Sequence, residues 1–137
     1  VQTISNAMDV GNPSNFIRIQ KIFNNDLFRM KKNLSGYAYT DDQTKKALKE
    51  IYAEKKYVAD PHGAVGYLGL KEYLHQHAED LYGVFLETAH PIKFIDTVEK
   101  TLKLKVPVPE RLKETLSKEK ESISIRDYRD LKSYLLD

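Results

Sequence analysis

The segment FLETAHPIKF, residues 85–94, places three chemically capable side chains where an apolar run ends. Thr88 offers a hydroxyl, His90 an imidazole and Lys93 an ammonium group. A similar group, Asp60 with His62, follows the extended-looking segment that ends at Ala59. Such side chains serve in acid–base catalysis, metal binding or ligand binding, so the neighbouring sequence must decide among these chemistries.

Most of these chemistries lack a supporting motif. His62 and His90 both adjoin a proline, but no HxH or HExxH pattern or nearby carboxylate frame supports a metal site. No GxSxG motif marks a nucleophile, and GAVGYLG is neither GxGxxG nor a P-loop. Thr88 has the alternative of capping the helix that follows it. Local patterns therefore indicate a ligand site without naming the ligand.

The clearest predicted element is a helix over TDDQTKKALKEIYAEKK, residues 40–56. Thr40 is a suitable N-cap, and Gln43 lies three residues later, as a capping box requires. The helical spacing predicts a buried stripe of Ala47, Leu48, Ile51 and Tyr52. An earlier helix is expected from Asn15, and a short strand over residues 37–39.

A second helix is expected from Pro61, because proline suits the first helical turn. It contains Gly63, Gly66 and Gly69, although glycine destabilises a helix interior by about 1 kcal/mol relative to alanine. Their three-residue spacing predicts a bare face against which another segment packs very closely. The alternative is that this stretch is a loop.

The run YGVFLETAH predicts the best strand of the chain, followed by a helix from Pro91 with Phe94, Ile95, Val98 and Leu102 on one side. The sequence VPVPERLKETL predicts an extended lead into a short helix. A last helix is expected over residues 124–136, and its inward residues would be Ile125, Tyr128, Leu131 and Leu135.

Alternation of strands and helices predicts an α/β fold, a short parallel sheet with flanking helices and two C-terminal helices. We expect a loop and helix in 1–35, strand–helix repeats in 36–104 and the C-terminal helices in 105–137. Ligands of such sheets bind beyond the carboxyl ends of the strands, where Asp60 and Thr88 would lie.

The composition of the 137 residues is that of a globular chain, with 41% hydrophobic and 31% charged residues. The 22 basic and 20 acidic residues are interleaved, which argues against a nucleic-acid partner. No membrane segment or signal peptide is evident, and the absence of cysteine fits the cytoplasm. The chain does not begin with Met, so we interpret it as a fragment.

Three motifs, taken in order, resemble those of the threonine synthase family. They are SNAMDVGNPSNF at 5–16, ADPHGAVGYLGL at 59–70 and ETAHPIKF at 87–94. The resemblance implies a pyridoxal-phosphate enzyme of the tryptophan-synthase-β fold type, of which this chain is the carboxy-terminal part. Two family features are missing here: the segment whose lysine forms the Schiff base and the Gly-rich loop that holds the cofactor phosphate.

The resemblance also implies an activity, conversion of O-phosphohomoserine and water to threonine and phosphate. By motif match, the Thr88 hydroxyl is expected to hydrogen-bond the pyridine nitrogen of pyridoxal phosphate. Further site-lining residues are expected on the three motifs: Asp60, His62, Gly63, His90, Lys93, Ser14, Asn15 and Phe16. No catalytic residue or metal ligand is assigned within this chain.

Two other functions remain open from the sequence. A phospho-lyase similar to threonine synthase would share these motifs, because they contact cofactor more than substrate. The other hypothesis is not an enzyme: a non-catalytic α/β module that binds a protein or small ligand. As a fragment, the chain is expected to be inactive alone, to lack the amino-terminal part of the same protein, and to self-associate through uncovered apolar surface.

Overall fold

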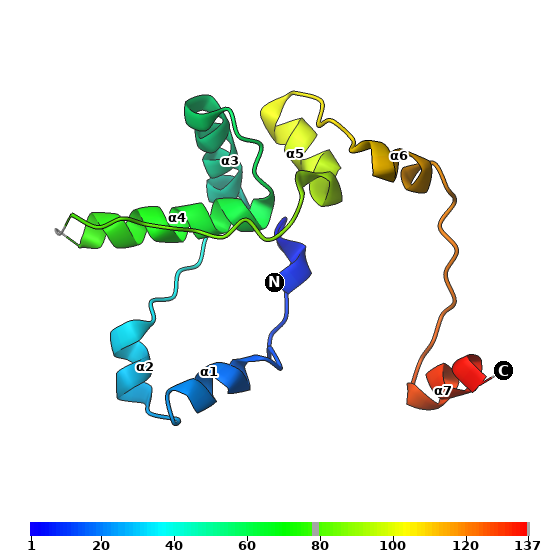
Figure 1. The fold of residues 1–137 in the computed structure, drawn as a ribbon, viewed down its shortest axis with the longest axis horizontal. Coiled ribbons are helices and arrows are strands. Elements are labelled where there is room, and N and C mark those ends of the chain that lie inside the picture. Colours follow the sequence, from blue (N-terminus) through cyan, green and yellow to red (C-terminus); the bar gives the residue numbers. More distant parts are fainter. Residues whose placement is uncertain (78–79, 137) are drawn as a thin grey trace. The chain divides into compact units, whose positions relative to one another are not determined.

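The structure is a computed structural model that describes residues 1–77 and 80–136, and it divides into two compact units, Val1–Pro107 and Val108–Asp137. Figure 1 shows the elements in chain order. They are the 3-10 helices η1 (Asn6–Met8) and η2 (Pro91–Phe94) and the α-helices α1 (Phe16–Ile22), α2 (Leu27–Asn33), α3 (Asp41–Lys55), α4 (Pro61–Gln76), α5 (Ile95–Leu102), α6 (Glu110–Leu116) and α7 (Tyr128–Leu136).

The core of the first unit lies between α3 and α4. It consists of Ala47, Leu48 and Ile51 from α3, together with Ala59 and Ala64, and Tyr67, Leu68 and Leu102 pack around it. The predicted stripe of α3 is therefore confirmed at its first three positions, while Tyr52 is half-buried. The small side chains of Ala47 and Ala64 allow α3 and α4 to approach closely.

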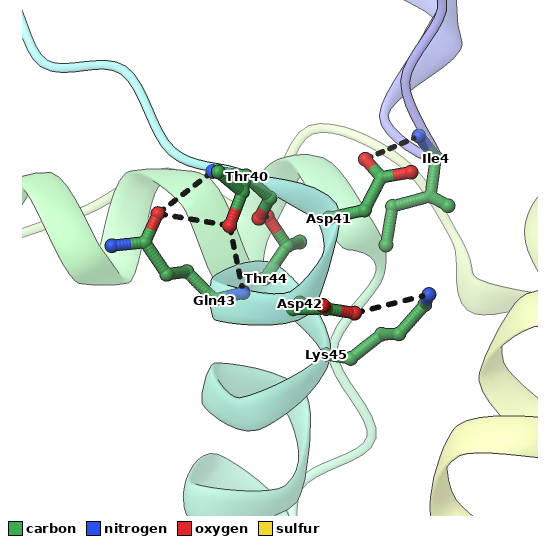
Figure 2. Close-up of polar contacts among 7 residues, drawn as sticks. All are labelled: Ile4, Thr40, Asp41, Asp42, Gln43, Thr44 and Lys45. Atoms are coloured by element: carbon green, nitrogen blue, oxygen red, sulfur yellow. Dashed lines mark hydrogen bonds and ion pairs between the residues drawn. The ribbon is translucent and has the colours of Figure 1, made fainter.

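The start of α3 is fixed by the predicted capping box (Figure 2). The backbone N–H of Gln43 donates to Thr40 Oγ1 at 3.3 Å, and Gln43 Oε1 accepts from the backbone N–H of Thr40 at 2.8 Å. These reciprocal bonds satisfy two donors that a helix start otherwise leaves free. Asp41 in the first turn also accepts from the backbone N–H of Ile4 at 3.1 Å, which attaches the N-terminal segment to α3.

Helix α4 includes all three glycines at three-residue spacing, and their bare face is covered as predicted. A Cβ on Gly63 would overlap the Glu87 carboxyl, and one on Gly66 would contact Phe85 at 3.9 Å. A Cβ on Gly69 would lie 3.4 Å from Cδ2 of the Tyr37 ring. Two segments distant in sequence thus pack against α4, and the loop alternative for this stretch is wrong.

The predicted parallel sheet is wrong, because no strand forms among residues 1–77 and 80–136. The expected strands are extended segments, and those around Tyr37 and Phe85 pack against helix α4. Tyr37 and Tyr39 hydrogen-bond through their hydroxyls to Gln76 and Glu72 of α4. The segment from Gly83 to Glu87 runs along the same helix (Figure 1).

The physical reason is that a continuous apolar run indicates a buried extended chain, but does not identify the element that buries it. A strand requires a neighbouring strand for its backbone hydrogen bonds, whereas a glycine face on a helix accepts an extended chain through side-chain packing alone. The α/β fold class is therefore replaced by an all-helical architecture for the described residues.

The helix expected from Asn15 is divided into two short helices, α1 and α2. α1 ends at Ile22, because Asn24 and Asn25 take the left-handed conformation, with φ of 53° and 57°. The chain then restarts as α2, whose N-cap Asp26 accepts from the backbone N–H of Arg29 at 3.0 Å.

The remaining helices follow their predictions in part. The helix expected from Pro91 forms as η2 and α5, and Val98 is buried in α5. In the second unit, α7 begins at Tyr128, where Asp127 accepts backbone N–H groups of the first turn, so Ile125 precedes the helix. The side chains expected to face inward are exposed: Tyr128, Leu131 and Leu135 at 76%, 39% and 70%. None of the described helices is long and apolar enough to cross a membrane.

Candidate functional site

A buried polar cluster surrounds the first turn of α4. Asp60 is the N-cap, and its Oδ1 accepts the backbone N–H of His62 at 2.8 Å. The same oxygen lies 2.6 Å from His62 Nδ1, so one carboxylate orients both the helix start and the imidazole ring. Asp60 is fully buried and His62 nearly so, with side-chain exposures of 0% and 13%.

Glu87 joins this cluster from the extended segment that precedes Thr88. Its Oε1 accepts the backbone N–H of Asp60 at 2.8 Å. Its Oε2 occupies the space that a side chain at Gly63 would fill, because a Cβ there would lie 1.8 Å away. Gly63 is therefore the residue that admits the Glu87 carboxyl to the end of α4.

The two carboxyl groups have opposite pKa shifts. Burial, reinforced by a hydrogen bond with the Asp60 carboxyl, raises the pKa of Glu87 to about 7. Burial also works to raise the pKa of Asp60, but hydrogen bonds from Glu87 and His62 outweigh it and hold that pKa below its usual value. These opposite shifts favour the proton on Glu87 and the negative charge on Asp60.

Three buried polar atoms of the cluster have no hydrogen-bond partner among the described residues: Asp60 Oδ2, Glu87 Oε2 and His62 Nε2. A proton on Glu87 would let its carboxyl donate to the Asp60 carboxylate beside it. The ring of His62 packs on Phe94, with centroids 4.8 Å apart. The loop from Thr88 to Phe94 is therefore held at both ends by the first turn of α4.

The predicted residues of the ETAHPIKF motif lie in that loop. Thr88 is exposed, immediately after Glu87. His90 Nδ1 accepts the backbone N–H of Ile92 at 3.1 Å, so His90 is the N-cap of η2, and the alternative that Thr88 caps this helix is wrong. Lys93 is exposed, and its backbone N–H donates to the carbonyl of His90 at 3.0 Å.

The first motif lies elsewhere in the unit. Asn15 is the N-cap position of α1 and makes no side-chain capping bond, and Ser14 is exposed beside it. Phe16 lines an apolar groove together with Ile19, Leu27 and Met30. Among the described residues, no hydrogen bond connects Ser14, Asn15 or Phe16 to the Asp60 cluster.

A larger groove runs beside the glycine face of α4. Its lining includes Tyr37, Gly66, Gly69, Val84 and Phe85, and it is open to solvent. Neither Thr88 nor Asp60 lines it. No group of three or more metal-ligating side chains was found among the residues that the structure describes.

Glu87 is the cluster member that sequence reasoning missed. The relevant signal was its register. Gly83, Phe85 and Glu87 alternate on one side of the extended segment, so a carboxylate occupies a position where the two preceding members contact α4. The second signal was the sequence ADPHG, in which Gly63 follows His62 and leaves space for the Glu87 carboxyl.

Comparison with known proteins now decides the family. The family model for the C-terminal region of threonine synthase matches residues 63–135, which contain most of α4, the Glu87–Thr88 pair and η2. The chain belongs to the threonine synthase family. It is 40% identical over 138 residues to threonine synthase of Buchnera aphidicola subsp. Baizongia pistaciae, an alignment that covers all of this chain and 31% of that relative.

Solved structures agree with this assignment. The crystal structure of threonine synthase from Escherichia coli matches with a TM-score of 0.84 and 33% identity, covering 98% of this chain and 30% of that one. A threonine synthase from Brucella melitensis, solved with pyridoxal phosphate bound, matches in fold with a TM-score of 0.65 at 24% identity, over 98% of this chain and 34% of that one. The chain thus corresponds to the C-terminal region of threonine synthase and spans about a third of the length of these relatives.

Proposed function

We propose that this chain forms one wall of the coenzyme site in a threonine synthase that converts O-phosphohomoserine and water to threonine and phosphate. The observation that carries the proposal is the family match over residues 63–135, which includes the Thr88 loop. The remainder of the site would come from the amino-terminal part of the same protein, because this chain spans only 31% of its Buchnera relative. Its cytoplasmic location stays a prediction.

The residues present fit pyridoxal phosphate at one edge of its ring. Thr88 is exposed, and its hydroxyl makes no hydrogen bond with the described residues, so it is free to meet a ring nitrogen. Because Glu87 faces α4, the extended backbone directs the next side chain to the opposite side, away from the buried cluster. Thr88 would therefore hold the pyridine nitrogen through its hydroxyl.

When bound, pyridoxal phosphate supplies an electron sink that stabilises carbanions. A neutral hydroxyl at the ring nitrogen, in place of a carboxylate, leaves that nitrogen largely unprotonated. With Thr88 at this position, pyridoxal phosphate would therefore be a weaker electron sink than with a carboxylate there. Lys93, an exposed cation in the same loop, is suited to attract the substrate phosphate, and His90 holds the loop through its cap on η2.

The test is an assay of phosphate release from O-phosphohomoserine with pyridoxal phosphate present. We expect turnover when the chain is part of the full-length polypeptide and none from residues 1–137 alone, because the lysine that carries the coenzyme lies outside them. Turnover by the isolated chain would contradict the assignment of a wall without its covalent anchor. Folded full-length protein that releases phosphate from other phosphoamino acids, but not from O-phosphohomoserine, would indicate a related phospho-lyase instead.

A further inference from the structure

The loop that carries Thr88 is held on the first turn of α4 by two separate contacts. Before Thr88, Glu87 accepts the backbone N–H of Asp60 at 2.8 Å and lies in the space left by Gly63. After it, the Phe94 ring packs on His62, whose ring is itself oriented by Asp60. Thr88 lies between these two contacts, and its own side chain makes no hydrogen bond to the described residues of α4.

We propose that Glu87 is a positioning residue for the coenzyme contact of Thr88, acting through the backbone of the extended segment. The inference rests on the proposed function, because it assigns Glu87 a role in that same site. It also gives a role to the Glu87 carboxyl, which is not explained by the Thr88 contact or by the cap of η2.

The geometry supports a positioning role over simple packing. Adjacent residues of an extended chain point to opposite sides, so the face taken by Glu87 determines the face taken by Thr88. Val84, Leu86 and Thr88 are exposed, whereas Phe85 and Glu87 are half-buried against α4. A carboxyl that accepts one backbone N–H fixes the register of this alternation by a directional bond, which apolar contact alone would not do.

The charge of the cluster also argues that Glu87 does more than fill the space beside Gly63. Asp60 already provides a buried negative charge within the same first turn, so a second carboxyl there must carry a proton or repel it. The alternatives Leu or Met would fill the space without that conflict. What they would lack is the acceptor for the Asp60 backbone N–H.

The experiment uses the full-length enzyme with four variants: Thr88→Val, Glu87→Ala, the double variant Glu87→Ala/Thr88→Val, and Glu87→Gln. The readouts are kcat, KM and the visible absorption band of the bound coenzyme, each measured on folded protein of confirmed thermal stability. The matched control is Glu119→Gln, an exposed glutamate in the second unit.

We expect Glu87→Ala to lower kcat by about 5- to 100-fold with a smaller change in KM, and to shift the coenzyme band in the same direction as Thr88→Val. In the Thr88→Val background the same substitution should add little, because the contact it positions is already gone. Glu87→Gln should largely restore kcat, since its amide oxygen accepts from Asp60 N–H and its NH₂ group donates to the Asp60 carboxylate.

Two failures are distinguishable. If Thr88→Val leaves the band and kcat unchanged, the proposed coenzyme contact itself is wrong. If Thr88→Val changes both but Glu87→Ala does not, or if the two effects are independent in the double variant, the positioning role of Glu87 is wrong while the proposed function stands. An effect of Glu87→Ala on thermal stability alone would also overturn the positioning role.

Discussion

The first turn of α4 and helix α7 differ in how much of their environment this chain supplies. Around α4, the described residues provide the cap, the counter-carboxyl, the glycine space and the apolar contacts, and Asp60, Pro61 and Ala64 are buried. Helix α7 has an apolar stripe at helical spacing, yet none of its described residues is buried. The same kind of pattern is therefore satisfied within the chain in one unit and left exposed in the other.

This difference shows which contacts position the candidate site. The position of Thr88 follows from contacts internal to Val1–Pro107, so substitutions there should act on the chain itself. The apolar side chains of α7 have no such contacts in the described part of the second unit, so their contribution depends on surfaces that this unit does not provide. Four stability measurements on the 137-residue chain separate the two cases.

The largest effect is expected for Leu48→Ala in α3. Leu48 is fully buried in the core between α3 and α4. Truncating a buried leucine removes transfer free energy and leaves a cavity, so the free energy of unfolding should fall by about 2–5 kcal/mol. Urea denaturation followed by circular dichroism measures it, and a loss below about 1 kcal/mol would show that this core is not the stabilising centre of the unit.

A smaller loss is expected for Gly63→Ala. The added Cβ would lie 1.8 Å from Glu87 Oε2, so Glu87 must leave its place or α4 must move. Overpacking of this kind lowers the free energy of unfolding by roughly 1–3 kcal/mol. The control is Gly36→Ala, where nothing lies within 4 Å of the new atom, and its urea midpoint should stay the same or rise slightly. Equal midpoints for both variants would contradict the close contact.

The third prediction concerns the pH dependence of stability. The pKa of Glu87 is about 7 in the folded chain against the usual 4.5, so between these values the folded state holds a proton that the unfolded state has lost. Its contribution to the free energy of unfolding is complete below pH 4.5, declines as the pH rises and is absent above about 7. Asp60, whose pKa lies below 3.8, and Tyr57, whose pKa lies above 10, titrate outside this window.

Comparison with Glu87→Gln isolates this effect. The stability of the unsubstituted chain, relative to the glutamine variant, should decrease as the pH is raised from 4.5 to 7 in urea titrations at several pH values. A difference that is constant across this interval, or that grows with pH, would mean that Glu87 is ionised in the folded chain.

The smallest effect is expected for Leu135→Ala in α7. This side chain is 70% exposed, so its truncation should change the free energy of unfolding of the chain by less than about 0.5 kcal/mol. The exposed stripe that includes Tyr128 is also a candidate for self-association. Sedimentation velocity should show a concentration-dependent larger species, reduced in this variant, and a strictly monomeric chain at high concentration would contradict the predicted self-association.

Elements with local chemical signals were predictable from the sequence. The Thr40 capping box, the α3 stripe and the bare glycine face of α4 all depend on residues within a few positions of each other, and all three are present. The sheet was not predictable, because the apolar run in residues 82–88 indicates a buried extended chain and says nothing about whether a strand or a helix covers it.

The contacts of the buried cluster around Asp60 could be anticipated only between residues that are neighbours in the sequence. Asp60, His62 and Gly63 were placed beside one another correctly by adjacency, whereas the contact with Glu87 joins residues 27 positions apart. Only the three-dimensional arrangement shows that Gly63 and Glu87 fit together, or that His90 takes the cap that Thr88 was equally suited to take. The proposed coenzyme role of Thr88 rests on the family and stays a prediction.

The most direct test of that role is the Thr88→Val variant of the full-length enzyme, measured by the absorption of bound pyridoxal phosphate and by kcat for O-phosphohomoserine. Valine keeps the shape of threonine and removes the hydroxyl. We predict a shifted coenzyme band and a kcat lowered by roughly 5- to 150-fold, the equivalent of about 1–3 kcal/mol of lost buried hydrogen bonding. An unchanged spectrum together with unchanged kinetics would contradict the assignment of Thr88 to the ring nitrogen.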